Sequence, residues 1–161
     1  MADNDNAYLD AYGSIVNYVQ RIREDLIEKE ISPNIEFKDI DGHAEDAVLQ
    51  NTDYIFLKDF SSHLETHFRY WVFMIGVSTF EDAGMFRHRQ IMNYIVNRFY
   101  PLTSIPLYDA EKLTKKKGIL VVEDPIDLWP FSKYNTRAVQ YLLVNVSSTE
   151  TTRERQLPDH I

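Results

Sequence analysis

The sequence predicts an α+β fold, with a mixed, mainly antiparallel β-sheet covered by a long N-terminal helix and a second central helix. Apolar residues recur with helical spacing over about residues 7–30 and again after Gly84. In contrast, residues 67–78 and 137–147 alternate as strands do. A chain of 161 residues and 19.0 kDa has the usual size of one domain. We therefore expect a single α+β domain over residues 1–148.

The N-terminal helix is predicted by apolar residues at alternating steps of four and three. These residues form one stripe: Tyr8, Tyr12, Ile15, Val19, Ile22 and Leu26. The stripe covers fewer than the three to four heptads that indicate a coiled coil, so packing on a sheet is the favoured use. Ser32 and Pro33 are expected to end the helix, and residues 35–38 alternate like a first strand.

The third predicted strand, about residues 67–78, has apolar side chains on both faces. Such a strand is central and covered on both sides, or covered on one side by a neighbouring subunit. A polar loop over residues 41–53 and a second strand over residues 54–60 precede it, and residues 61–66 would form the hairpin connection.

The second helix is predicted from Met85 to Phe99, with Thr79 and Asp82 as candidate capping residues and Pro101 at its end. Four prolines punctuate the next thirty residues, where short strands are expected at 105–108 and 118–123 and an exposed turn at 115–118. A final strand follows over residues 137–147. The polar residues 149–161 are expected to form a mobile C-terminal arm.

Charge is distributed unevenly along the chain, whose net charge is −8. Residues 1–60 contain fourteen Asp or Glu and five Lys or Arg (net −9), whereas residues 61–161 contain eleven and twelve (net +1). This balance argues against general affinity for a phosphate backbone. An acidic face and a more neutral face of this kind could meet between subunits in a head-to-tail ring. A solvated acidic surface explains the same charge distribution equally well.

Composition and segment patterns also bear on the compartment. The absence of cysteine excludes disulfides and fits a reducing compartment. Neither a signal-peptide pattern nor an apolar run of about 20 residues occurs, so we expect a soluble, cytoplasmic protein with no membrane partner.

Catalytic motifs are absent from the sequence. There is no phosphate-binding or dinucleotide glycine pattern and no nucleophile-elbow serine. His63 and His67 with an acid from residues 41–46 are the best metal candidates, but their spacing does not match the helical HExxH pattern. We therefore expect no catalytic residues, no metal and no cofactor.

Contact with a partner is a candidate role for three groups of residues, each of which also has a purely structural interpretation. Arg87 and Arg89 are candidates for ion pairs with a partner, or else are solvated. Lys115, Lys116 and Lys117, with Lys112 nearby, form the strongest basic cluster, which is a solvated turn or a contact with DNA or an acidic neighbour. Trp129 and Phe131 lie in a proline-rich loop, where they either cover their own core or anchor in another subunit.

Over about residues 7–148 the chain resembles the tail-terminator proteins of long-tailed bacteriophages. The resemblance rests on the order of elements and on the stretches RYWVFMIGVST, FRHRQIMNYIVNRFYP and AVQYLLVNVSS. It implies a non-enzymatic virion protein that forms a six-fold ring, caps the tail tube, stops its polymerisation and docks the head-side connector. The implied partners are further copies of the chain, tail-tube protein, connector or neck proteins and possible sheath contacts, with DNA only passing through the lumen.

That resemblance also implies a location at the head-proximal end of the tail in the virion, and in the host cytoplasm during assembly. Two alternatives stay open. One is a soluble, non-enzymatic adaptor that binds another protein through residues 125–136, or another neck or baseplate component. The other is a small metal-dependent hydrolase that uses His63 and His67.

Overall fold

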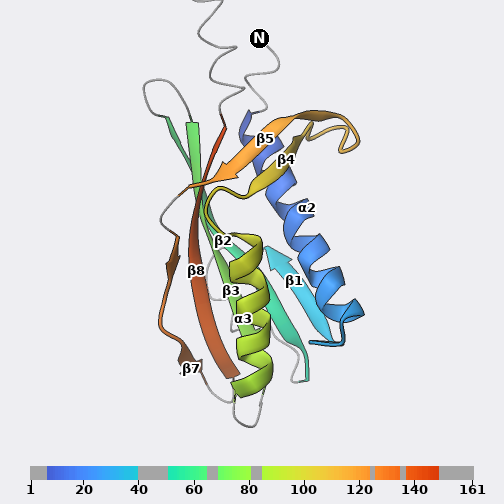
Figure 1. Cartoon of the computed structure of the whole chain (residues 1–161), viewed down its shortest axis with the longest axis vertical. Helices are drawn as coiled ribbons and strands as arrows, with labels where there is room; N and C mark the ends of the chain where they lie inside the picture. Colours follow the sequence, from blue (N-terminus) through green and yellow to red (C-terminus); the bar gives the residue numbers. More distant parts are fainter. Residues whose placement is uncertain are drawn as a thin grey trace, which may run out of the picture.

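The α+β fold expected from the sequence is confirmed by the computed structural model, which describes residues 7–39, 51–64, 69–80, 85–123, 126–134 and 137–148 (Figure 1). The elements are α2 (Ala7–Glu28), β1 (Ile35–Asp39), β2 (Asp53–Leu64), β3 (Arg69–Thr79), α3 (Phe86–Arg98), β4 (Ser104–Tyr108), β5 (Lys116–Val122), β6 (Asp127–Leu128), β7 (Ser132–Tyr134) and β8 (Arg137–Ser148). Residues 149–161 and the loop at 40–50 lie outside the described residues, and the single-domain boundary stays a prediction.

The sheet has the strand order β1-β2-β3-β8-β5-β4. Strand β1 is parallel to β2, and all the other pairs are antiparallel, so the sheet is mixed as predicted. Strand β3 lies between β2 and β8, which confirms its central position. The short strands β6 and β7, which the sequence did not predict, pair with the side of β8 that β3 leaves open.

Both helices cover one face of this sheet (Figure 1). The side chains that β3 and β8 direct to this face are fully buried: Trp71, Phe73, Ile75, Val77, Leu142, Val144 and Val146. They meet the apolar stripe of α2 and residues Ile91 and Ile95 of α3. Burial of each large apolar side chain contributes about 1.5–3 kcal/mol, so this shared core is the main source of stability.

The opposite face of the sheet is also apolar at its centre. Gly76 of β3 lies under the ring of Tyr141, since an added Cβ would be 2.6 Å from the Tyr141 Cε1 atom. Phe56 and Met74 on this face are 1% and 8% exposed. The glycine is therefore needed for close approach of a ring to the backbone, because any side chain there would displace Tyr141.

The start of α3 differs from the prediction. Its N-cap residue, Met85, has a left-handed conformation (φ 61°) and no side-chain capping bond. Thr79 instead has its Oγ1 atom 3.1 Å from Nδ1 of His88, inside the first turn of the helix. Thr79 therefore fixes a buried histidine, while Asp82 lies outside the described residues.

Strands β4 and β5 form a hairpin that packs against α2, far from the centre of the sheet (Figure 1). Asp10 of α2 holds it in place, because its carboxylate accepts hydrogen bonds from Lys117 Nζ (2.7 Å) and from the backbone N–H of Ala110 (2.8 Å). Ser14 Oγ accepts a third bond from the N–H of Tyr108 (2.8 Å). The exposed turn predicted at 115–118 is thus wrong in part, since residues 116–118 belong to β5.

Candidate interaction surfaces

Arg87, which the sequence offered as a contact for a partner, forms an ion pair within the chain. Its Nε lies 2.9 Å from Oδ2 of Asp53, and its Nη2 donates to the carbonyl oxygen of Phe80 at 2.9 Å. The guanidinium also stacks 4.3 Å above the Phe80 ring. Arg87 is therefore engaged within the chain, where its pair with Asp53 joins β2 to the first turn of α3, and a contact of Arg87 with a partner stays a prediction.

Asp53 is the centre of a buried polar cluster, with its side chain 1% exposed. Ser32 Oγ donates to it at 2.6 Å and the backbone N–H of Phe80 at 3.2 Å. Arg137 lies nearby and donates to Ser78 Oγ at 2.7 Å. Burial lowers the pKa of Arg137 from its ordinary value, while the charge of Asp53 opposes that shift. We call Asp53, Arg87 and Arg137 the Asp53 cluster.

Arg89, the other predicted cation on α3, is exposed to solvent. It has no ion pair with the residues that the structure describes. Its place in an interface stays a prediction, whereas its neighbour His88 is 1% exposed and has Nε2 3.0 Å from Oε1 of Gln140.

Trp129 and Phe131 lie on residues 126–134, which we call the edge segment because it follows the open side of β8. The backbone N–H of Trp129 donates to the carbonyl of Tyr141 (2.9 Å), and Gln140 Nε2 donates to the carbonyl of Trp129 (3.0 Å). The backbone is thus fixed, and the ring of Phe131 lies next to that of His88, with centroids 6.1 Å apart. Leu128, Trp129 and Phe131 are 45%, 43% and 41% exposed, which leaves an apolar strip available to a partner.

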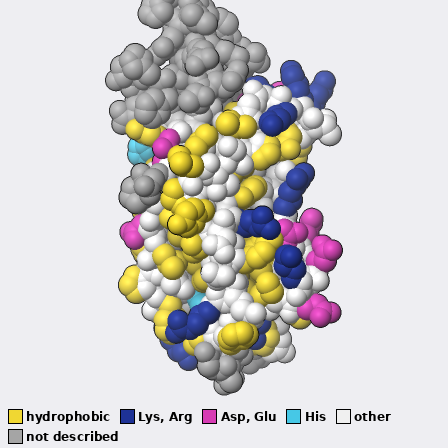
Figure 2. Space-filling model, in the orientation of Figure 1, with side chains coloured by type: hydrophobic (Ala, Val, Ile, Leu, Met, Phe, Trp, Pro, Cys, Tyr) yellow, Lys and Arg dark blue, Asp and Glu magenta, His cyan; other side chains and the backbone are white. Residues whose placement is uncertain are grey.

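The three lysines of the basic cluster differ in their surroundings. Lys115 and Lys116 are exposed, whereas Lys117 pairs with the buried Asp10 at 2.7 Å. Lys117 thus has an acidic partner within the chain, and a contact of the lysines with DNA or an acidic neighbour stays a prediction. Figure 2 shows cationic side chains where the β4–β5 hairpin lies and acidic ones along the C-terminal half of α2.

Asp109 holds the turn at the tip of this hairpin. Its Oδ1 accepts the backbone N–H groups of Glu111 (2.8 Å) and Lys112 (3.2 Å). These bonds, that of Glu111 first, lower the pKa of Asp109 below its ordinary value, because they stabilise the charged carboxylate. The lysine-bearing turn is thus a defined structure.

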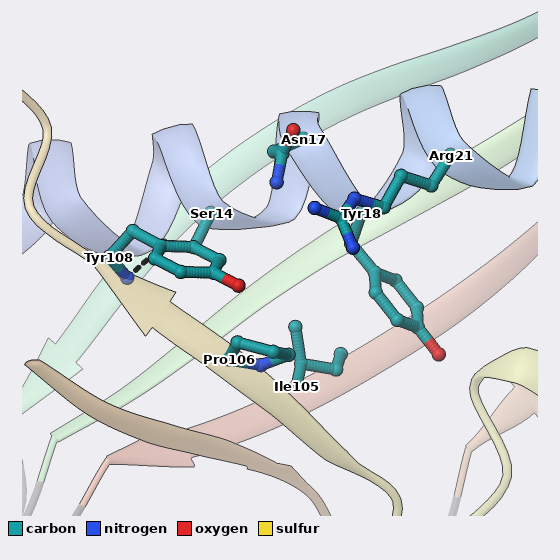
Figure 3. A pocket seen from close by; sticks show the side chains of 7 residues that line it. All are labelled: Ser14, Asn17, Tyr18, Arg21, Ile105, Pro106 and Tyr108. Carbon is teal, nitrogen blue, oxygen red and sulfur yellow. Dashed lines mark hydrogen bonds between the residues drawn. The ribbon is translucent and has the colours of Figure 1, made fainter. Parts of the chain in front are cut away.

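A small hollow of about 20 Å³ lies between α2 and β4, and we call it the α2–β4 groove. It is lined by Ser14, Asn17, Tyr18, Arg21, Ile105, Pro106 and Tyr108. In Figure 3 the guanidinium of Arg21 extends back along the helix toward Asn17, and the hydroxyl of Tyr108 points into the same gap. Hydrogen-bond donors from the helix and the strand therefore converge on one place.

Two lining residues of this groove are already engaged. The hydroxyl of Tyr18 donates to the carbonyl of Arg98 at 2.6 Å, and burial raises its pKa. Ser14 donates to the carbonyl of Asp10. The sequence placed Arg21 off the apolar stripe of the helix but could not identify the strand opposite it, so the groove was missed.

A wider groove of about 250 Å³ lies beside the first turns of α2, lined by Tyr8, Leu9, Tyr12, Asp39, Asp59 and Phe60. The rings of Tyr8 and Tyr12 are stacked, with centroids 6.4 Å apart, and both meet Phe60 edge-on. Asp59 has a left-handed backbone (φ 55°) at the register shift between β2 and β3. This bulge turns Phe60 toward the helix and builds the aromatic wall.

The hypothesis of a metal-dependent hydrolase finds no set of metal ligands among the residues that the structure describes. There, no group of three His, Asp or Glu side chains is placed to hold a metal ion. His63 is exposed, with Nε2 3.4 Å from Ser61 Oγ, and His67 and residues 41–46 lie outside the described residues. Among the described residues, neither helix has the length and apolar character needed to cross a bilayer.

Comparison with known proteins assigns no family to the chain. No protein-family model matches it, and no curated protein is similar to it in sequence. One solved structure of unstated function is similar with a TM-score of 0.48 and 9% identity, over 80% of this chain and 94% of that one. A likeness this low carries no argument about function.

Proposed function

We propose that this protein is a non-enzymatic assembly factor of a phage tail, similar to tail terminators. In this role, copies of the chain form a ring that caps the tail tube, stops its growth and presents a docking surface for the head-side connector. The ring, its six-fold symmetry and its partners come from the resemblance of the sequence. The structure supports the proposal through one observation, the exposed apolar strip on the edge segment.

This exposed apolar strip is the kind of surface that a protein partner buries. Leu128, Trp129 and Phe131 are each more than 40% exposed, and they lie within four consecutive positions, whereas other exposed apolar side chains of the described residues, such as Phe86 and Leu102, lie elsewhere in the fold. Aromatic side chains dominate the energy of protein interfaces, because they remove a large area from water at low entropic cost. A second copy that covers this strip would make the contact that a ring repeats.

The shape of the molecule is also suited to repeated side-by-side contact. The edge segment follows β8 on one side of the molecule, while α2 and β1 lie on the other side (Figure 1). The β4–β5 hairpin starts at the same side of β8 as the edge segment and extends across to α2. The two sides differ in composition, so a contact between them is head to tail and closes into a ring when the rotation allows it.

The test measures the mass of the purified chain by gel filtration with light scattering, alone and with the tube protein of the same phage. We expect a discrete ring, and tube growth that stops when the ring is added. Trp129→Ala should weaken the ring while the monomer stays folded, because the anchor of the strip is lost. A strict monomer that never binds tube ends would overturn the proposal.

The exposed strip also fits the adaptor alternative. An adaptor predicts a complex with a different protein and no symmetric ring, which electron microscopy of the complex distinguishes from a terminator.

A further inference from the structure

The α2–β4 groove has the chemistry of a receptor for a carboxylate. The guanidinium of Arg21, the amide of Asn17 and the hydroxyl of Tyr108 line it together (Figure 3). None of these three side-chain groups is hydrogen-bonded or ion-paired with the residues that the structure describes. A guanidinium binds carboxylates with two parallel hydrogen bonds, and an amide and a hydroxyl add further donors.

The walls of the groove add an apolar component. Ile105 and Pro106 form its floor from β4, and the ring of Tyr18 closes one end (Figure 3). At about 20 Å³ the enclosed part exceeds the roughly 10–15 Å³ that one water molecule needs, so it accepts the tip of a side chain and no larger ligand. A carboxylate carried on a protein surface fits both its size and its charge.

A carboxylate of this kind stands on the opposite side of the molecule. Asp127 begins β6 on the edge segment, is exposed, and makes no hydrogen bond or ion pair with the described residues. The apolar side chains of Leu128 and Trp129 follow it directly. A contact made by the edge segment would therefore bring an acid and its apolar neighbours to the partner together.

Other described carboxylates fit less well. Asp10 and Asp53 are buried and paired within the chain, and Asp109 caps the hairpin turn. The exposed acids of α2 lie on the same helix as the groove, so they cannot meet it in a head-to-tail contact between opposite sides.

We propose that the carboxylate of Asp127 in one copy of the chain enters the α2–β4 groove of the next copy and pairs there with Arg21. Leu128 and Trp129 then pack on Pro106, which is partly exposed at the groove, and shield the ion pair from water. This inference deepens the proposed function, since it names the two surfaces that would form the repeated contact of the ring. Charge selects the partner surface and the apolar strip provides most of the affinity.

A charge exchange tests the pairing. Arg21→Glu alone and Asp127→Arg alone each place two like charges in the contact, and should each weaken assembly at least about tenfold, or about 1.4 kcal/mol. The double variant Arg21→Glu with Asp127→Arg restores an opposite pair and should recover most of the loss. Sedimentation at several concentrations, with the wild type measured in parallel, gives the assembly constant.

Control variants separate a specific pair from a change in net charge. Glu28→Lys and Lys29→Glu alter exposed charges at the C-terminal end of α2, outside the lining of the groove and the edge segment, and should change the assembly constant less than about twofold, since exposed charges contribute little. All variants change exposed side chains, so their thermal unfolding should match the wild type. Should a charge reversal unfold the chain, Arg21→Gln and Asp127→Asn replace it, and each should still weaken assembly.

The outcomes distinguish this inference from the proposed function. If the wild type assembles and the single reversals assemble equally well, or the double variant is no better than the singles, the pairing is wrong while the ring proposal stands. If the wild type stays monomeric with and without tube protein, the ring proposal fails and the pairing fails with it.

Discussion

The Asp53 cluster and the α2–β4 groove both contain arginine, but the first is buried and contains a carboxylate, whereas the second is open to solvent and contains none. In the Asp53 cluster, two arginines from α3 and β8 surround a carboxylate that is 1% exposed, and each guanidinium also bonds to backbone or hydroxyl oxygens. In the groove, Arg21 is exposed and has no acceptor among the described residues. An arginine on a helix therefore stabilises the fold where the chain itself provides a carboxylate. Where the chain provides none, the arginine is available to bind a partner.

The largest effect should come from Asp53→Ala, which leaves Arg87 without its carboxylate acceptor and Arg137 without the nearby negative charge that opposes its desolvation. Breaking a buried pair costs about 3–5 kcal/mol, because a charge stays buried without compensation. Urea unfolding of the variant and the wild type measures this loss. The matched control is Glu36→Ala, since its carboxylate is 53% exposed and 3.7 Å from Arg23, and should cost only about 0–1 kcal/mol. Equal losses for the two variants would contradict the comparison.

A second prediction compares the two arginines directly. Arg87→Met should lower the free energy of unfolding by about 2–4 kcal/mol, because the buried Asp53 loses the cation with which it forms an ion pair. Arg21→Met should change it by no more than about 0.5 kcal/mol, since the residue is exposed. Its effect should appear in the assembly constant instead. A destabilised Arg21→Met monomer would show that the groove serves the fold.

A third prediction compares two glycines, one with a side chain packed against it and one with free space around it. Gly76→Ala should cost about 1–3 kcal/mol, because its Cβ would be 2.6 Å from the Tyr141 ring and force it to move. Gly13→Ala in α2 should stabilise the protein by about 0.5–1 kcal/mol, since nothing lies within 4 Å and alanine favours the helix. Denaturant unfolding of the two variants measures both effects. If both midpoints moved in the same direction relative to the wild type, the prediction would be wrong.

The smallest effect concerns the pH dependence of Asp109. Its pKa is lower in the folded chain than the ordinary 3.8, so its contribution to stability is complete above that value and is lost as the pH falls through the lowered pKa. Asp109→Asn should therefore have a lower melting temperature than the wild type at pH 7. Well below pH 3.8 the two should melt alike. A difference that persists in acid would mean that the charge is irrelevant to the turn.

Elements with a strong local pattern could be predicted from the amino-acid sequence alone. The period of the apolar stripe predicted a helix over residues 7–30, and the helix observed is Ala7–Glu28. Strands β3 and β8 were predicted nearly to their observed bounds, because alternation and β-branched residues reveal a strand wherever it pairs. The fold class followed from these repeat patterns, because a helix with one apolar stripe and a sheet with an apolar face bury those surfaces against each other.

Which charged side chains pair within the chain could not be predicted from the sequence. Nothing near Arg87 in the sequence indicates Asp53, and nothing near Lys117 indicates Asp10, since each pair joins elements that meet only when the sheet forms. The strands β6 and β7 were missed because prolines interrupt their pattern and the open side of β8 supplies their pairing. The groove at Arg21 likewise exists only because β4 crosses α2. Side-chain periodicity is set by neighbours along the chain, whereas pairing between distant residues depends on the folded topology.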